Sequence, residues 1–347
     1  MVARELHPAD AVDRFLSRRR GQSSSKTVRS YSERLEHFVA FCEEHDIESM
    51  STVDGWTLDE FYHWRSSQNV EPVTVKGTMA TTKQLLKFCA DLEVVDPTLP
   101  DRVPTVTLSK GEESSDVRLE TERAKELLAM YRDSTKRFGT SWHATLELAW
   151  HSGARLGGML ALDIQDFDPD MGTVHFQHRP DQGTRLKNGY DGERIVELNP
   201  DTVDVLEFWI ARERPDTADE YGREPLFATY HGRASESSIR SWCYLGTQPC
   251  LVRSCPHGRV RRNCEYTERQ RASTCPSSRS PHAVRTGSIT WQLGQIEDIE
   301  IVAERVNAAP STIRRYYDVA TPEEKFDERR RGIGSNLDIT TSGDADA

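Results

Sequence analysis

The chain has 347 residues, a length typical of two domains rather than one. Hydrophobic residues make up 36% of it, which is enough to fill ordinary cores and excludes global disorder. No run of about 18 apolar residues is present, so we expect no membrane-spanning helix. The N-terminus also lacks the apolar core of a signal peptide, and we therefore expect a cytoplasmic protein.

The net charge of −11 hides an unusual set of charged residues. Nine of the 45 basic residues are lysines, which leaves 45 − 9 = 36 arginines against 56 acidic residues. An acid-rich, lysine-poor surface is typical of proteins that stay soluble in concentrated salt, so we expect a halophilic protein. Residues 251–285 run against this trend with eight arginines and two glutamates, and form either a solvated loop or a surface that faces a polyanion.

Residues 1–105 are predicted to form a small α-helical domain. The segment SKTVRSYSERLEHFVAFCEEH (25–45) begins with Ser and Thr and repeats apolar residues at helical spacing. The segments at 57–68 and 71–95 show the same pattern. Residues 106–116, rich in serine and charge, are predicted to be a linker.

Residues 117–320 are predicted to form a second domain that is mainly α with a small antiparallel β hairpin. Helical patterns begin near TERAKELL, SWHATLEL and PDTVDVLEF and recur between residues 281 and 317. Residues 172–179 and 193–199 alternate in period two on either side of a polar turn, which predicts the hairpin. Residues 321–347 are charged and poor in hydrophobic residues, and are predicted to be a tail.

Five of the seven cysteines lie in a Cys- and Arg-rich insertion at residues 243–279. Disulfides are rare in cytosolic proteins, so a metal site is the better interpretation of this cluster. The segment is poor in hydrophobic residues, and a structural zinc ion held by four thiolates would replace the missing core. The alternative is a loop with free thiols, and His257 is left open as a further ligand. The predicted Zn²⁺ ligands are Cys250, Cys255, Cys264 and Cys275.

Four short motifs place reactive side chains in order along the second domain. They are HSGARLGG with Arg155, GTRLKNG with Lys187, SPHAVRTG with His282 and Arg285, and RRYYDV with Tyr316 and Tyr317. Each motif alone is weak, because isolated surface arginines and lysines are common. Together the motifs fit one reaction, the attack of a tyrosine on a phosphodiester.

The chemistry of this reaction explains the residue types. Two arginine forks can hold the oxygens of one phosphate, and a helix that starts at Arg155 adds backbone N–H groups. A tyrosine needs this clamp because its neutral hydroxyl, with a pKa of about 10, is a poor nucleophile. A lysine can protonate the departing 5′ oxygen, and a histidine can hold or move the tyrosine proton. No acidic cluster of the two-metal kind is present, so we expect arginines, and no divalent metal, to carry the charge. A covalent adduct would keep the phosphodiester energy, so we expect no need for ATP either.

The chain resembles tyrosine recombinases of the phage-integrase and Xer-like family over nearly its whole length. In that family an α-helical, SAM-like core DNA-binding domain precedes a mixed α+β catalytic domain, as residues 1–105 and 117–320 do here. The resemblance implies a site-specific recombinase that cuts and rejoins double-stranded DNA through a 3′-phosphotyrosine, working as a tetramer on two duplexes. It places Arg155 and Arg285 in the clamp, Lys187 as the acid and His282 beside the nucleophile.

Two positions depart from the family pattern. Gly158 stands where an acidic residue often follows the first arginine, so Arg155 must find its support elsewhere. Asn307 stands where the family usually has His or Trp, and it can donate a hydrogen bond to a phosphate oxygen but cannot titrate. These departures leave one alternative open, a catalytically impaired, zinc-stabilised DNA-binding regulator on the same scaffold.

Only one of the two neighbouring tyrosines can face the clamp, because adjacent helical residues point about 100° apart. The family spaces its tyrosine nine or ten residues after the position that Asn307 fills, which gives Tyr316 or Tyr317. Pro310 is typical of the ten-residue form and suits the first turn of a helix. The resemblance therefore favours Tyr317 as the nucleophile.

Overall fold

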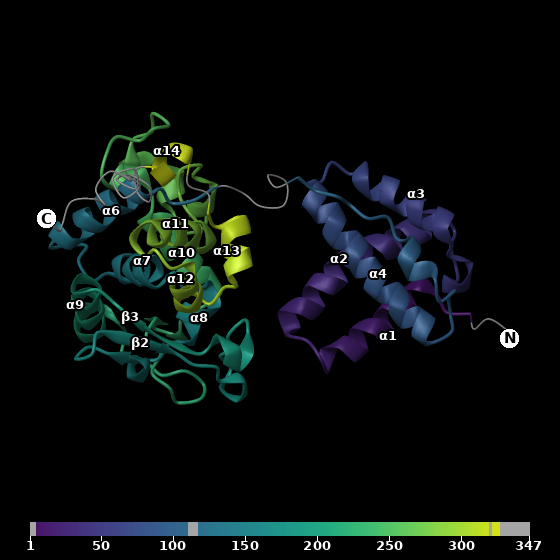
Figure 1. The fold of residues 1–347 in the computed structure, drawn as a ribbon, viewed down its shortest axis with the longest axis horizontal. Helices are drawn as coiled ribbons and strands as arrows, with labels where there is room; N and C mark the ends of the chain where they lie inside the picture. The colour runs from purple at the N-terminus through teal and green to yellow at the C-terminus, as the bar shows by residue number, and fades with distance from the viewer. Residues whose placement is uncertain (1–4, 110–116, 319–320, 327–347) are drawn as a thin grey trace, which may run out of the picture. The chain divides into compact units, whose positions relative to one another are not determined.

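The computed structural model describes residues 5–109, 117–318 and 321–326. The chain divides into two compact units, Met1–Ser115 and Asp116–Ala347 (Figure 1). Most of the predicted linker and of the predicted tail lies outside the described residues. Within the described residues, no helix is long and apolar enough to cross a membrane.

The first unit is a bundle of α helices joined by short 3-10 turns. The helices are α1 (Pro8–Arg20), α2 (Ser25–Glu44), α3 (Gly55–Ser66) and α4 (Pro72–Asp91), and the turns are η1 (Met50–Thr52) and η2 (Leu99–Arg102). Helix α4 contacts each of the other three helices. Leu35, Phe38 and Phe41 of α2 are buried in the core of the unit, which confirms the helix predicted from their spacing.

Side-chain caps determine where these helices begin. At the start of α2, the Ser24 hydroxyl accepts a hydrogen bond from the Thr27 N–H at 3.2 Å. At the start of α3, Asp54 and Thr57 cap each other's backbone N–H groups, at 2.9 and 3.4 Å.

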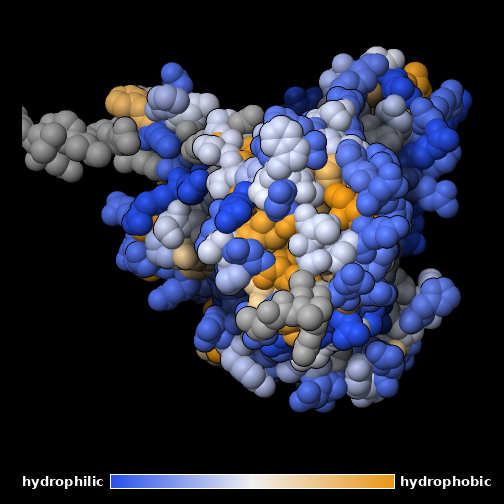
Figure 2. Space-filling view, turned by 90° about the vertical axis from the view of Figure 1, so that its right-hand side faces the viewer, coloured by the Kyte–Doolittle hydropathy of each residue, from blue (hydrophilic) through white to orange (hydrophobic). Residues whose placement is uncertain are grey.

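Figure 2 shows a face of the molecule that is mostly hydrophilic around a smaller hydrophobic area.

The second unit is built around the buried helix α7, which contacts α6, α9, α10 and α11. Its core is apolar and includes Trp150, Phe176 and Phe227. A π-helical turn, η6 (Trp209–Glu213), extends α9. The helices are α6 (Thr121–Asp133), α7 (Ser141–Ser152), α8 (Leu156–Ala161), α9 (Pro200–Phe208), α10 (Glu236–Gly246), α11 (Pro281–Gln295), α12 (Ile299–Val306), α13 (Pro310–Tyr316) and α14 (Pro322–Lys325).

A three-stranded antiparallel sheet lies beside these helices. Strand β2 (Thr173–Phe176) pairs with β3 (Arg194–Glu197), and β1 (Phe167–Asp168) pairs with the other edge of β2. This pairing confirms the predicted hairpin, although both strands are shorter than expected. A second small sheet, formed by β4 (Ala228–Thr229) and β5 (Gly232–Arg233), was not predicted. The fold is therefore mainly α with small antiparallel sheets.

The remaining connections contain short 3-10 turns. Three of them flank the first sheet, namely η3 (Ile164–Asp166), η4 (Pro180–Gln182) and η5 (Gly189–Gly192). Four lie in the Cys- and Arg-rich insertion, namely η7 (Pro249–Leu251), η8 (Arg261–Asn263), η9 (Glu265–Thr267) and η10 (Ala272–Thr274). Arg123 of α6 anchors the insertion by donating to the carbonyls of Thr247 and Ser277. Some of its arginines pair with glutamates, as Arg253 does with Glu126, which reduces its positive charge.

Candidate active site

Tyr317 lies at the end of α13, in contact with α11. Pro310 occupies the first turn of α13, where a missing N–H breaks no helical hydrogen bond. Tyr317 is the C-cap residue at the other end of the helix. The Tyr317 N–H donates to the Ile313 carbonyl at 3.0 Å, and the Tyr317 carbonyl accepts from the Thr290 hydroxyl of α11 at 2.8 Å. These bonds fix the position of the tyrosine, whose side chain is only 7% exposed.

The ring of Tyr317 faces two residues of the SPHAVRTG motif. The Arg285 guanidinium lies 5.4 Å from the centre of this ring, and the His282 ring centre lies 6.0 Å from it. The ring of Tyr316 instead lies beneath Arg315, at 5.2 Å. The structure therefore sets Tyr317, and not its neighbour, against the predicted clamp.

Three arginines converge on the C-terminal end of α12. Arg194, Arg285 and Arg155 donate, in that order, to the backbone carbonyls of residues 305, 306 and 307. The first two bonds are both 2.8 Å long. The last carbonyls of a helix lack intrahelical partners and carry a partial negative charge, so cationic donors stabilise them. Helix α12 thus positions arginines that come from three other elements, β3, α11 and α8.

Arg285 is a deeply buried cation, with 1% of its surface exposed. Its Nη1 donates to the carbonyls of Gly153 and Val306, but Nε and Nη2 find no hydrogen-bond partner in the part of the chain that the structure describes. Burial, and then the nearby charge of Arg155, lower the pKa of Arg285 to about 10, while Tyr317 opposes this effect. Burying a cation with unpaired N–H donors costs free energy of folding. An anion bound at this place would pair the charge and accept the free hydrogen bonds.

Arg155 is the N-cap residue of α8 and is half-buried. Burial lowers the pKa of Arg155, and the nearby Tyr317 raises it in part. The carbonyl of Asn307 accepts its hydrogen bond, so a backbone group gives the support that Gly158 cannot. A side chain at position 158 would meet Phe176, because a Cβ there would stand 3.4 Å from the phenyl ring.

Lys187 lies in the turn between β2 and β3, and its side chain is exposed. The next residue, Asn188, donates through Nδ2 to the Oδ1 atom of Asn307 at 2.7 Å, which ties this turn to the end of α12. Gly192 leaves room for this pair, since a Cβ there would stand 2.8 Å from the Asn307 Nδ2 atom. The side chain of Asn307 thus holds the lysine turn, and its bond to a phosphate stays a prediction.

His282 lies in the first turn of α11, next to the arginines. Although the residue is exposed, partial burial of its ring lowers the pKa of His282 below the ordinary value. The positive charges of Arg285, Arg155 and Lys187 lower it further. The imidazole is therefore neutral at neutral pH and can accept a proton.

The sequence-based prediction missed Arg194. Its guanidinium lies 4.0 Å from the ring centre of Phe176, and burial lowers the pKa of Arg194 to about 9. The charges that add to this effect are those of Arg285, Arg155 and Arg305. A signal was present in the sequence, because Arg194 and the buried Val196 are two apart in a strand and so share the inward face.

The four cysteines predicted to bind zinc are free thiols, of which Cys275 is buried and the others are partly exposed. Across the described ranges, no group of three or more His, Cys, Asp or Glu side chains is placed to hold a metal ion. Arg261 donates to the Cys250 sulfur at 3.0 Å, and the His257 Nε2 is hydrogen-bonded to the Ser277 hydroxyl at 2.9 Å. In this arrangement the thiols do not fit a zinc ion, and zinc stays a prediction from the sequence.

A helical N-terminal unit is followed by a helical unit with a small sheet, in which a tyrosine is set against arginines. This arrangement agrees with the class that the sequence motifs predict, a site-specific DNA recombinase with the integrase fold. The fold brings Arg155, His282, Arg285 and Tyr317 together and leaves Lys187 on the adjoining turn.

Comparisons with known proteins show what the chain is similar to. Residues 12–91 match the family described as phage integrase, N-terminal SAM-like domain. Over 213 residues the chain is 23% identical to the tyrosine recombinase XerD of Staphylococcus epidermidis, a match that covers 61% of this chain and 67% of XerD. Residues 12–91 thus match a phage-integrase domain, and the chain is similar to tyrosine recombinases, which supports a site-specific recombinase.

Solved structures share the fold. The Tn1549 transposon integrase in complex with transposon right end DNA matches with a TM-score of 0.62 and 14% identity, covering 94% of this chain and 100% of the integrase. The integrase of lambda, solved as a tetramer bound to a Holliday junction, matches with a TM-score of 0.61 and 11% identity, covering 91% of this chain and 79% of that one. At these identities the likeness concerns the fold alone.

Proposed function

We propose that this recombinase cuts DNA by attack of Tyr317 on a scissile phosphate, forming a 3′-phosphotyrosine. The observation that carries the proposal is the environment of Arg285. It is buried, it lies 5.4 Å from the ring of Tyr317, and two of its nitrogen atoms, Nε and Nη2, have no hydrogen-bond partner among the described residues. The non-bridging oxygens of a phosphodiester would accept these hydrogen bonds beside the nucleophile.

The proposed reaction uses only side chains of this chain. Arg155 and Arg285 hold the phosphate, and each keeps its Nη1 bond to the end of α12. The phenol oxygen of Tyr317 forms a bond to phosphorus, its proton passes to the neutral His282, and the bond to the 5′ oxygen breaks. Lys187 gives this leaving oxygen a proton. The phosphodiester energy stays in the adduct, so the reverse reaction rejoins DNA without ATP or a divalent metal.

The partner in this proposal is double-stranded DNA, and the acting form is a homo-oligomer. The solved integrases support it, because one is bound to transposon end DNA and another is a tetramer on a Holliday junction. We infer a tetramer on two duplexes, acting in the cytoplasm. The excess of acidic residues over lysines supports work at high salt.

A covalent adduct with DNA is the test of the proposal. The full chain is incubated, with EDTA and without ATP, with nicked duplexes that tile the DNA flanking its gene. Denaturing gels separate covalent complexes, and sequencing of the attached DNA gives the site. A recombinase gives an adduct at one sequence. Specific binding in a gel shift without any adduct would overturn the proposal and favour a DNA-binding regulator.

A further inference from the structure

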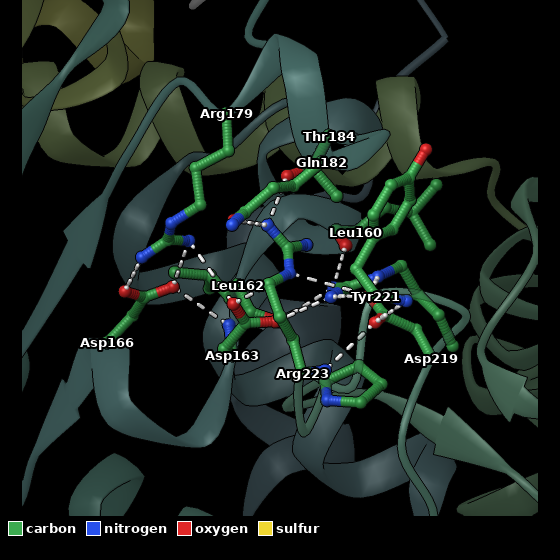
Figure 3. Close-up of polar contacts among 12 residues, drawn as sticks. Leu160, Leu162, Asp163, Asp166, Arg179, Gln182, Thr184, Asp219, Tyr221 and Arg223 are labelled. Carbon is green, nitrogen blue, oxygen red and sulfur yellow. Dashed lines mark hydrogen bonds and ion pairs between the residues drawn. The ribbon is translucent and has the colours of Figure 1, made fainter.

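A network of charged side chains lies next to the turn that carries Lys187. It contains three aspartates and three arginines, so its formal charge is zero, and the reaction proposed above does not use it (Figure 3). Asp163 and Asp166, which follow α8, are both buried. The members of this aspartate–arginine network are Asp163, Asp166, Asp219, Arg179, Arg223 and Arg233.

On one side the network is fixed to α8, the helix that Arg155 caps. Arg233 of β5 donates to the carbonyls of Leu160 and Leu162 at 2.8 and 3.2 Å, at the end of this helix. The same guanidinium is paired with Asp163 at 2.6 Å. The network therefore has a fixed position relative to the helix that begins at the clamp arginine.

On the other side the network grips the lysine turn through Arg223. The Nη1 atom of Arg223 donates to the Thr184 hydroxyl at 3.0 Å and to the Gln182 side-chain oxygen at 3.3 Å (Figure 3). Its Nε lies 3.4 Å from the Asp163 carboxylate. Thr184 also pairs with Arg179 through two backbone hydrogen bonds of 2.9 and 3.1 Å.

A short stretch of chain connects this grip to the lysine. The N–H of Leu186 donates to the Nδ1 atom of His178 at 3.0 Å, and the Leu186 side chain is buried. Lys187 follows directly and lies three residues after Thr184. The base of the exposed lysine is thus held on its N-terminal side by Arg223 and His178.

We propose that Arg223 is a positioning residue for Lys187. A general acid must lie within hydrogen-bond reach of the oxygen that it protonates, and an exposed lysine on a free turn would lose rotamer and backbone freedom to get there. Arg223 holds the turn at Thr184. Its ion pair with Asp163 connects the turn to the end of α8. The inference rests on the proposed function, in which Lys187 protonates the 5′ oxygen.

Cleavage with two leaving groups tests this role. The DNA is the nicked duplex identified by the adduct assay, made once with the ordinary 5′ oxygen and once with sulfur at that position. A thiol has a pKa of about 8.5 and leaves without a proton, so the sulfur duplex does not need a general acid. Single-turnover adduct formation is measured for the wild type, Lys187→Ala, Arg223→Gln, Thr184→Val and Thr184→Ser.

The expected pattern is selective. Arg223→Gln and Thr184→Val cleave the ordinary duplex about tenfold or more slowly, a part of the 10²- to 10⁴-fold that a general acid contributes. Both cleave the sulfur duplex at the wild-type rate, as Lys187→Ala does. Thr184→Ser keeps the acceptor hydroxyl and cleaves both duplexes like the wild type.

Equal slowing of the variants on both duplexes, or wild-type rates on both, would overturn the positioning role. Thermal unfolding is recorded for each variant. If Arg223→Gln does not fold, the cleavage rates of Thr184→Val test the positioning role, because this variant removes one hydroxyl and leaves the ion pairs. If Lys187→Ala shows no recovery with sulfur, the lysine role and this inference both fail, while an adduct formed by the wild type leaves the recombinase proposal intact.

Discussion

Arg155 donates a hydrogen bond to the backbone carbonyl of Asn307, the residue that turns the chain from α12 toward Tyr317. Arg155 and the segment that leads to Tyr317 are therefore held by one peptide group. Because the acceptor is a carbonyl, the bond survives a change of the Asn307 side chain. The side chain has a separate partner, Asn188, so the two contacts can be tested apart.

Substitutions of Asn307 are expected to separate backbone from side-chain effects. The residue has φ = 51°, in the left-handed region, which glycine adopts freely and alanine adopts at a cost of about 1 kcal/mol. Asn307→Gly is therefore expected to be more stable than Asn307→Ala by about this amount, as measured by urea unfolding. Both variants lose the bond to Asn188 and are expected to cleave DNA more slowly.

The matched control is Asn69, which has φ = 54° in the first unit and lies outside the candidate site. The same two substitutions at Asn69 should reproduce the stability difference without slowing cleavage. Equal stability of the glycine and alanine variants at Asn307 would contradict the expectation.

The two tyrosines are expected to behave differently in the adduct assay. Tyr317→Phe removes only the attacking oxygen, so the ring still packs on Arg285, and the covalent band should disappear while DNA binding remains. Tyr316→Phe should keep the band, because its ring lies against Arg315. A band that survives in the first variant and is lost in the second would reverse the assignment.

The pH dependence of adduct formation should report His282. Its pKa is lowered by partial burial and by neighbouring positive charges, so it stays neutral below the ordinary histidine value of about 6.5. If it accepts the tyrosine proton, the single-turnover rate should be flat above about pH 6.5 and fall only at more acidic pH. His282→Gln should be slower and lack this acid limb. An acid limb that persists in this variant would assign the titration to another group.

The same shift has a consequence for stability. Between the lowered folded pKa and the ordinary unfolded pKa of about 6.5, the unfolded chain binds more protons at His282 than the folded chain. The contribution of this residue to the free energy of unfolding is therefore full above the unfolded pKa and is lost as pH falls below it. Urea unfolding of the wild type and His282→Gln across this range measures the difference.

Glu147 is expected to be a main determinant of the stability of the second unit. It is fully buried in α7, and burial alone would raise its pKa, but hydrogen bonds from His143 and Arg132, with the His151 ring 3.4 Å away, hold the pKa of Glu147 well below its ordinary value. Glu147→Gln leaves the Arg132 guanidinium without its buried anion and should lower the free energy of unfolding by about 3 kcal/mol. The stabilisation by this carboxylate is present above its unfolded pKa and is lost on acidification through the folded pKa.

The control for this change is Glu122→Gln on α6. Glu122 pairs with Lys125 at 2.8 Å, but both side chains are exposed, so the loss should stay within about 0.5 kcal/mol. Similar effects of the two substitutions, measured by urea unfolding, would show that the charge of Glu147 is not needed for folding.

Elemental analysis tests the zinc prediction for the Cys- and Arg-rich insertion. The sequence predicts one Zn²⁺ per chain, and the described side chains do not form a ligand group in its absence. If the prediction holds, the purified chain contains about one zinc atom, and Cys264→Ser lowers this content. The buried Cys42 in the first unit supplies the control, since Cys42→Ser should leave the zinc content unchanged. Less than about half an atom per chain would exclude a four-cysteine site.

The helices and the hairpin could be predicted because their side chains repeat with the period of the backbone. Leu35, Phe38 and Phe41 show this for α2, and Val174 opposite Val196 shows it for the β hairpin. The two-residue strands β4 and β5 are too short to show any period.

The candidate site was only partly predictable. The order of the motifs indicated Arg155, His282, Arg285 and Tyr317, which the fold brings together. The acceptors that hold the arginines are backbone carbonyls, and every residue type carries one, so no sequence pattern could indicate them. The pairing of Asn188 with Asn307 could not be predicted either, because it depends on tertiary position alone.

The docking of three arginines on consecutive carbonyls makes the register of α12 more important than its composition. Side chains at its end can change with little effect on the arginines, because none of them is the acceptor. Insertion or deletion of one residue in α12 would instead rotate its end by about 100° and move it by about 1.5 Å. All three contacts would be lost in one step, so the exposed positions of this helix should tolerate substitution far better than the helix tolerates a change in length.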